Sequence, residues 1–332
     1  MTRVAITGAS GLLGSNLAAE LLGAGHSVIA TRRAGTQVAH LADLGGRGRD
    51  GIEWRDADLA DQAALAKAFA GAEAVFHCAA MVTVKREVTP AMVDANVTGT
   101  ERVIAACASA GVKRLVHTSS VVAIGLTTTG APSDETARWN FDELGLLDAY
   151  AITKHQAEDR VRASSIDAVI VNPTYMFGPR DARPSSGKMI VDVARRRVPS
   201  WTPGFNNFVD VRDVARGMIL AWQRGKRGER YILGGHDMTY KACFDTIARV
   251  AGVKPPRFKA PLPVAKLLGA WGDFQERRGK DPIVNSTQIR YAYTDKFRFT
   301  SARAQKELGY TYGPLEPAIG DAIAWFRAHA ML

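Results

Sequence analysis

The chain has 332 residues, of which 46% are hydrophobic and 23% are charged, and its formal net charge is +10. This composition is typical of a soluble globular protein, and the length allows one large α/β domain or two lobes. No aromatic and basic platform and no helix-turn-helix pattern accompanies the positive charge, so we do not expect nucleic acid as a partner. An anionic cofactor, an anionic substrate or a membrane surface explains the charge as well.

The three cysteines, Cys78, Cys107 and Cys243, form neither a metal-ligand pair nor an even disulfide framework. We therefore expect no metal site, and a reducing cytoplasm is the location that fits best. The first predicted strand starts at Arg3, and no apolar run approaches the roughly 18 residues of a membrane span. The sequence predicts neither a secretory signal nor a transmembrane helix.

A glycine-punctuated turn joins the first predicted strand, Arg3 to Thr7, to a predicted helix, Ser15 to Gly23. In this turn Gly8 permits a sharp bend, Gly11 lets backbone N–H groups approach a pyrophosphate, and Gly14 allows close packing of helix on strand. The helix N-terminus adds donors and partial positive charge. Glycines at this spacing also occur in ordinary loops. The predicted contacts to a dinucleotide are Gly8, Ser10, Gly11, Leu12, Leu13 and Gly14.

The second predicted strand ends at two arginines, Arg32 and Arg33, where an NAD site usually has an acidic residue. Guanidinium groups suit the 2′-phosphate of NADP, so we predict NADP, with NAD as the alternative. The alternative is that both arginines are solvated side chains on a surface turn and bind no cofactor. After the third strand, Asp58 could accept a hydrogen bond from the adenine amino group or could cap the helix that follows it.

Strands and helices alternate through the first half of the chain. Such alternation requires parallel strands covered on both faces, so we predict a doubly wound, Rossmann-like α/β sheet. The strands are expected at Arg3 to Thr7, Ser27 to Thr31, Ile52 to Asp56, Ala74 to His77, Arg114 to Thr118 and Ala168 to Asn172, and helical patterns at Asp61 to Phe69 and Pro90 to Ala110.

Candidate catalytic residues follow the fifth strand. Ser120, with Ser119 as the fallback, could donate to a substrate carbonyl at the sheet edge. Tyr150 and Lys154 are four residues apart and share one face of a predicted helix. We expect the Lys154 ammonium to lower the pKa of the Tyr150 phenol, which would suit proton transfer to an alkoxide, and to hydrogen-bond the nicotinamide ribose.

Prolines break the chain after Asn172, and a smaller substrate-binding lobe is expected there. We assign residues 1–173 to the dinucleotide-binding core, with 206–235 returning to it, and 174–205 and 236–332 to the smaller lobe. Aromatic residues around Tyr175, Trp201 and Phe205 could line a cleft for a flat or apolar substrate, or could be core packing between lobes.

The segment Leu262 to Phe274 is apolar and is followed by Arg277, Arg278 and Lys280. An amphipathic helix with a basic flank can lie on an anionic membrane. Most such stretches are instead lobe helices packed on a core, and we favour that interpretation here.

These motifs together resemble those of the extended short-chain dehydrogenase/reductase superfamily, the NAD-dependent epimerase/dehydratase family, and in particular its dihydroflavonol-reductase-like branch, which includes hopanoid-associated sugar epimerase-like proteins. The resemblance implies a catalytic Ser120, Tyr150 and Lys154 triad and often a homodimer. It also implies cofactor contacts at Ala79, Ala80 and Pro173. Asp58-Leu59 is one of the matching segments, so we expect Leu59 to contact the cofactor as well. The similarity runs nearly end to end, and its matching segments include Thr118-Ser119-Ser120, Phe208-Val209-Asp210 and the segment from Gly228 to Gly235.

Three functions remain open from the sequence. The first is an NADP-dependent reductase of a ketone or aldehyde, with a substrate that is aromatic, polyketide-like or lipid. The second is an epimerase that oxidises and then reduces one bound substrate without net consumption of cofactor. The third is a dinucleotide-binding sensor without catalysis. The Tyr150 and Lys154 pair counts against the sensor, and the Arg32 and Arg33 pair favours the reductase.

Overall fold

A computed structural model describes residues 1–44, 51–83, 85–280 and 282–332. Its main sheet has seven parallel strands in the order β10-β6-β5-β4-β1-β2-β3. The strands are β1 (Arg3–Thr7), β2 (Ser27–Arg32), β3 (Ile52–Asp56), β4 (Ala74–His77), β5 (Arg114–Thr118), β6 (Ala168–Pro173) and β10 (Arg230–Leu233). The predicted doubly wound parallel sheet is confirmed, and all six strands expected in the first half are present.

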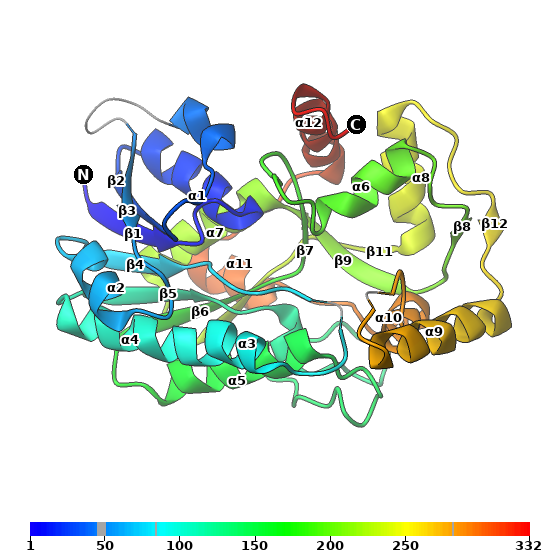
Figure 1. Ribbon diagram of the computed structural model, residues 1–332, viewed down its shortest axis with the longest axis horizontal. Helices are drawn as coiled ribbons and strands as arrows, with labels where there is room; N and C mark the ends of the chain where they lie inside the picture. The colour runs from blue at the N-terminus through cyan, green and yellow to red at the C-terminus, as the bar shows by residue number, and fades with distance from the viewer. Residues whose placement is uncertain (45–50, 84, 281) are drawn as a thin grey trace.

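Helices cover both faces of this sheet, as Figure 1 shows. On one face lie α1 (Leu12–Gly23), α7 (Val211–Arg224) and α11 (Ala302–Leu308), and on the other lie α2 (Gln62–Phe69), α4 (Gly99–Ser109) and α5 (Ala149–Ala163). Successive strand residues point to opposite faces. Val4 and Ile6 therefore join the first core, whereas Ala5 joins the second. Because both faces of the sheet are buried, the sequences of its strands are nearly continuous runs of apolar residues.

Two helical predictions change in detail. The first helix begins at Leu12 rather than at Ser15, because Gly11 takes the extended N-cap conformation. The helical pattern at Pro90 to Ala110 forms α3 (Pro90–Val93) and α4, and the backbone between them, Asp94–Thr98, widens into one turn of π-helix. Such turns occur often at functional sites.

The smaller lobe lies at the end of the molecule opposite the N-terminus (Figure 1). It contains a three-stranded sheet of β11 (His236–Thr239), β9 (Phe205–Asp210) and β7 (Tyr175–Phe177), and a pair of short parallel strands, β8 (Ser200–Trp201) and β12 (Phe258–Lys259). Its helices are α6 (Gly187–Ala194), α8 (Tyr240–Ala251), α9 (Leu262–Arg277), α10 (Ser286–Tyr293) and α12 (Leu315–Ala328). Buried apolar side chains of β7, β9, α6, α8 and α12 form one hydrophobic cluster.

The boundary between the two parts differs from the predicted one in two segments. In the segment 206–235, α7 and β10 return to the main sheet as expected, but β9 pairs with β11 and β7 in the smaller lobe. Conversely, Ala304, Leu308 and Tyr310 pack in the core beside α1 and α7, although they lie in the range assigned to the smaller lobe. A long-range apolar contact of this kind leaves no local signal in the sequence.

Candidate active site

The glycine turn between β1 and α1 lies at the carboxyl edge of the sheet, where the strand order reverses between β1 and β4. Ligands of open α/β sheets bind at this point. Gly8 has a φ of +74°, and a Cβ there would lie 2.6 Å from the backbone N of Ala79. A Cβ on Gly14 would lie 2.3 Å from the carbonyl oxygen of Gly8. Both positions therefore require glycine for steric reasons.

Gly11 differs from the other two glycines. A Cβ there would meet one atom, the Gly8 carbonyl oxygen, at 3.5 Å. Gly11 is also the N-cap of α1, and no side chain caps this helix end. The first N–H groups of α1, at Leu12 and Leu13, are thus left without a capping side chain, as an anion-binding helix N-terminus requires. The turn fits the pyrophosphate of a dinucleotide.

Of the other predicted cofactor contacts, Ala79 lies against this turn, within 2.6 Å of a Cβ built on Gly8. Ala79 and Ala80 follow β4, and the Ala79 N–H donates to the Thr7 side chain at 3.3 Å. Pro173 ends β6 and is buried. Leu59 packs against the apolar core under α2 and α4, so its side chain has a structural role there.

The hollow beside β2 and β3 has a volume of about 670 Å³ and is lined by Arg33 and Asp58, as predicted, together with Asp56 and Arg183. Arg32 is not part of its lining. The Arg32 guanidinium donates from Nε to Asp56 Oδ1 at 2.9 Å and lies over the Trp54 ring. The predicted arginine pair is therefore divided, because Arg32 at the end of β2 faces a carboxylate at the end of β3.

Two residues of this hollow were missed by sequence reasoning. Arg183 comes from the loop after β7, and Asp56 ends the neighbouring strand, so neither is close to Arg33 in sequence. The Asp58 carboxylate accepts from the Ala60 N–H at 2.9 Å, while Asp61 caps α2 by accepting from Ala64. Asp58 thus stabilises a turn and does not itself cap the helix.

Ser120 and Tyr150 meet at the carboxyl ends of β5 and β6. Ser120 follows β5 and begins a short 3₁₀ turn, and Tyr150 lies in the first turn of α5, which Asp148 caps through the Ala151 N–H at 2.7 Å. A hydrogen bond with Ser120 acts on the Tyr150 hydroxyl. Ser119 is buried and its hydroxyl has no partner among the described residues, so it has no comparable contact with Tyr150.

The pKa of Tyr150 differs from the prediction. Burial and, to a smaller extent, the nearby Asp148 carboxylate raise the pKa of Tyr150 from 10.0 to about 12, against the opposing effect of the hydrogen bond with Ser120. The expected lowering by Lys154 is wrong for this state, because the Lys154 ammonium donates to the Thr118 carbonyl at 2.6 Å. At neutral pH the phenol therefore carries its proton, as a general acid must.

Lys154 lies one turn after Tyr150 on α5 and is buried. Burial lowers its pKa from 10.5 to about 8, and the Glu158 carboxylate, one further turn along the helix, raises it in part. A cation remains at this position at neutral pH. The i to i+4 spacing that was read from the sequence does bring the phenol and the ammonium to one site.

A buried carboxylate behind Lys154 was also missed. Glu158 accepts from Asn172 Nδ2 at 2.8 Å and from Arg230 Nη1 at 3.2 Å, and the same Asn172 amide donates to the Ser120 carbonyl at 3.0 Å. These contacts connect α5, β6 and β10 with the serine. They hold Glu158, one helical turn after Lys154, in fixed relation to Ser120, and sequence spacing could not reveal them because the partners lie up to 72 residues apart.

The aromatic residues of the smaller lobe serve mainly as core. Tyr175 packs edge-on against Phe177 and Phe208, and Phe177 is fully buried. Trp201 also packs against this cluster, and its Nε1 is buried without a partner in the described part of the chain. The alternative of core packing is therefore correct for Tyr175 and Phe177.

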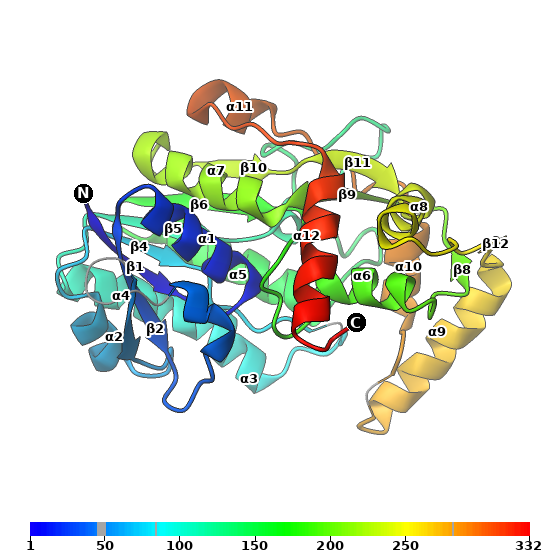
Figure 2. The same ribbon diagram turned by 90° about the horizontal axis from the view of Figure 1, so that it is seen from above.

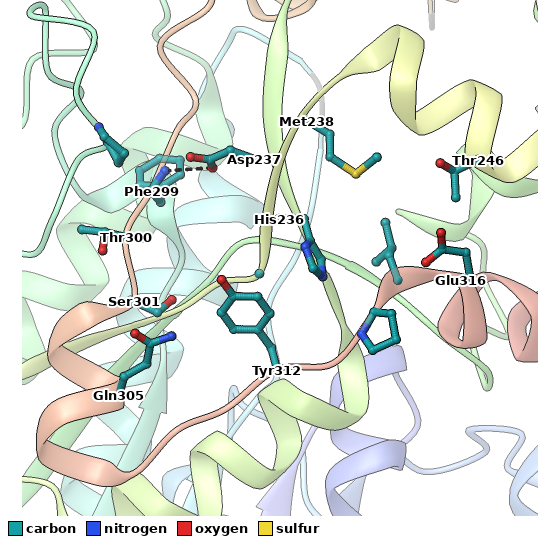
Figure 3. Close-up of a pocket in the computed structure, with 14 residues that line it drawn as sticks. His236, Asp237, Met238, Thr246, Phe299, Thr300, Ser301, Gln305, Tyr312 and Glu316 are labelled. Atoms are coloured by element: carbon teal, nitrogen blue, oxygen red, sulfur yellow. Dashed lines mark hydrogen bonds between the residues drawn. The ribbon is translucent and has the colours of Figure 1, made fainter.

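A second hollow, shown in Figure 3, lies between β11, α11 and α12, and is lined by His236, Asp237, Tyr312 and Glu316, among others. Its volume is about 610 Å³. None of the predicted catalytic or cofactor-binding residues lines it. This hollow is therefore separate from the residues that the sequence predicts to carry the chemistry.

Comparison with known proteins shows the family of this chain. A profile of the family described as the NAD dependent epimerase/dehydratase family matches residues 4–234. The chain belongs to this family. Its matched region includes the glycine turn, Ser120, Tyr150 and Lys154, so the resemblance drawn from the motifs is confirmed.

The proteins to which this chain is similar include one that is named as a ketoreductase. The sterol demethylase protein B of Methylococcus capsulatus is 34% identical, with 98% of this chain and 99% of that protein aligned. The 4-hydroxy-2-methyl-3-oxo-4-farnesyl-3,4-dihydroquinoline-1-oxide ketoreductase of Stigmatella aurantiaca is 28% identical over 93% of this chain and 91% of its own length. The crystal structure of gox2253 superposes with a TM-score of 0.83 at 34% identity and covers 100% of both chains.

No helix among the described residues has the length and apolar character needed to cross a membrane.

Proposed function

We propose that this protein is an NADP-dependent reductase that converts a ketone or an aldehyde to an alcohol. The observation that carries the proposal is the protonated, desolvated phenol of Tyr150, hydrogen-bonded with Ser120 and one helical turn from the cation of Lys154. Reduction of a carbonyl needs a proton donor at the developing alkoxide, and a neutral phenol at this point can be that donor.

The side chains of the site have different roles in the reduction. The Tyr150 hydroxyl gives its proton to the carbonyl oxygen, and the Ser120 hydroxyl donates a hydrogen bond to the same oxygen as negative charge develops. The ammonium of Lys154 stabilises the phenolate that remains, and Glu158 keeps that ammonium charged. A nicotinamide cofactor, when bound along the glycine turn, supplies the hydride.

Arg33 and Arg183 would hold the 2′-phosphate that distinguishes NADP from NAD. Both line the hollow at the end of β2 and β3, and neither has a carboxylate partner among the described residues in the way that Arg32 has Asp56. Guanidinium groups bind phosphate through paired hydrogen bonds. This assignment keeps Arg33 from the sequence prediction and replaces Arg32 by Arg183.

Exposed apolar residues next to the predicted cofactor contacts support an apolar substrate. Met81 and Val82 follow directly on Ala79 and Ala80, and 42% and 60% of their surfaces are exposed. Apolar side chains that remain exposed beside a polar catalytic centre favour a ligand with an apolar part. The related ketoreductase is named for a substrate that carries a farnesyl group.

An epimerase that retains NAD is the second candidate, and one observation favours it. Asp56 lies in the same hollow as Arg33, where a carboxylate could accept a hydrogen bond from the 2′-hydroxyl of NAD. An epimerase of this kind returns the hydride to its substrate, so its cofactor stays bound and is not consumed.

Cofactor turnover distinguishes the two functions. The purified protein should carry little NAD, and with a panel of apolar ketones and aldehydes it should consume NADPH in a one-to-one ratio with the alcohol formed. The Tyr150→Phe variant should bind NADPH normally and lose about 10²–10⁴-fold in turnover. Recovery of close to one NAD per chain, with epimers interconverting without added cofactor, would establish the epimerase instead.

A further inference from the structure

Helix α9 is packed with its small residues inward and its large apolar residues outward. Ala265, Gly269 and Gly272 are buried, and α10 with the residues before it covers this side. A Cβ on Gly269 would lie 3.1 Å from Ile289, and one on Gly272 would lie 1.8 Å from the Val284 carbonyl oxygen. Close backbone approach therefore fixes which side of α9 faces the protein, contrary to the ordinary core helix that the sequence favours.

The opposite side of α9 exposes an apolar stripe. Leu267 is 72% exposed and Trp271 is 59% exposed, and Phe258 in the strand before the helix is 73% exposed. The stripe consists of Leu262, Val264, Leu267, Leu268, Trp271 and Phe274. Each of the last five members lies three or four residues from another member, so they form one continuous face of the helix. Figures 1 and 2 both show α9 at the end of the molecule opposite the N-terminus.

Among the residues that the structure describes, the exposed charged side chains along this stripe are basic. Exposed basic residues precede it, accompany it and follow it, namely Lys254, Arg257, Lys259, Lys266, Arg277, Arg278 and Lys280. None of them forms an ion pair with a carboxylate in the described ranges. The two acidic residues of α9 are engaged on its other side: Asp273 with Arg86 and Ser286, and Glu276 with the Arg86 N–H.

We propose that this outward face of α9, with Phe258 beside it, binds the surface of a lipid bilayer that contains anionic lipids. Aliphatic and aromatic side chains on one side of a helix and lysines and arginines at its borders are the features of an interfacial helix. A second copy of this chain fits less well, since two such faces would bring like charges together. The acidic groups of α9 are turned toward the protein, where they do not oppose binding.

The position of α9 connects this surface with the active site. Arg86 donates to Asp273 at 3.0 Å through its guanidinium and to Glu276 at 2.8 Å through its backbone N–H. Arg86 lies in the loop that begins after Ala79 and Ala80 with the exposed Met81 and Val82. A protein bound through α9 would therefore hold this entrance close to the bilayer, from which an apolar molecule could enter.

The test is sedimentation with vesicles of phosphatidylcholine alone or of phosphatidylcholine with phosphatidylglycerol as the minor component. The full chain should sediment with the mixed vesicles and only weakly with pure phosphatidylcholine, and added salt should weaken the binding. The Leu267→Asn/Trp271→Asn variant should bind at least tenfold more weakly, while Leu267→Met/Trp271→Phe should bind nearly as the wild type does.

A charge-matched pair of variants separates local from overall charge. Lys266→Glu/Arg278→Glu should lose binding to the mixed vesicles, whereas Lys306→Glu/Arg327→Glu, which changes net charge equally on other helices, should retain it. NADPH affinity and melting temperature serve as folding controls and do not depend on membrane contact. The proposal is overturned if the wild type remains in the supernatant with mixed vesicles, or if Leu267→Asn/Trp271→Asn splits a dimer that binds no vesicles.

Discussion

The two ends of the candidate dinucleotide site differ in burial and in the kind of electrostatics they use. At the proton-transfer end, Lys154 and Glu158 are buried, and fixed hydrogen bonds reach from Glu158 through Asn172 to Ser120. At the ribose-phosphate end, Arg33 is exposed and shares an open hollow with Asp56 and Arg183. Burial shifts pKa values by one to several units, whereas exposed charges act through a screened field. The first end should thus determine the chemistry and the second the choice of cofactor.

The largest effect should come from the buried carboxylate at the first end. Glu158→Gln leaves the Arg230 guanidinium, which is largely buried, without its countercharge, so we expect the free energy of unfolding to fall by about 3–5 kcal/mol. The side chains of this ion pair are only 16% and 2% exposed. Urea unfolding measures the change. Glu143→Gln, which removes the partner of the exposed Arg138, is the control and should change stability little. Equal effects of the two substitutions would show that burial does not matter here.

Between the two ends, the glycine turn offers a steric comparison. Gly14→Ala places a Cβ 2.3 Å from the Gly8 carbonyl oxygen, a backbone atom that cannot turn aside. We expect a loss of about 1–3 kcal/mol in stability. Gly11→Ala meets no atom closer than 3.5 Å, so it should leave the melting temperature nearly unchanged and weaken dinucleotide binding instead. Thermal unfolding and NADPH titration of both variants measure these two effects. The prediction is wrong if Gly11→Ala is the less stable of the two variants.

The preference for NADPH over NADH tests the roles of the arginines at the ribose-phosphate end of the site. Each charge-assisted contact to phosphate contributes roughly 1.5–3 kcal/mol, so Arg33→Ala/Arg183→Ala should reduce the preference for NADPH over NADH more than tenfold. Arg32→Ala is the matched control, because its guanidinium is already paired with Asp56. Fluorescence titrations with both cofactors measure the preference. A larger loss in Arg32→Ala than in the double variant would restore Arg32 to the phosphate site, where the sequence placed it together with Arg33.

The smallest effect concerns the pH dependence of stability. Because folding lowers the pKa of Lys154 from 10.5 to about 8, the unfolded chain binds more protons than the folded chain between these values. The difference in unfolding free energy between the wild type and Lys154→Met should therefore rise with pH above pH 8, by at most about 1.4 kcal/mol per pH unit. Measurements should stop at pH 10, since the raised pKa of Tyr150 acts in the opposite direction above its ordinary value of 10.0. A difference that stays constant or falls with pH contradicts the buried lysine.

Local patterns in the sequence predicted the strands of the main sheet and the steric need for Gly8 and Gly14. They also predicted the shared helix face of Tyr150 and Lys154. These features depend on periodicity and on contacts within a few residues, so the order of residues determines them directly. The parallel arrangement then brings the carboxyl ends of all strands to one edge, which is why Ser120 could be placed near Tyr150 without a structure.

Tertiary structure decided what depends on partners far along the chain. It assigned Arg32 to Asp56, brought Arg183 to the hollow beside Arg33, and placed Glu158 between Asn172 and Arg230. It also reversed the expected direction of the Tyr150 pKa shift, because desolvation is set by everything that surrounds a group and not by its nearest charged neighbour in sequence. For α9 the sequence determined an amphipathic helix, but only the close approach of Gly269 and Gly272 to the residues before and within α10 decided that the large apolar side faces outward.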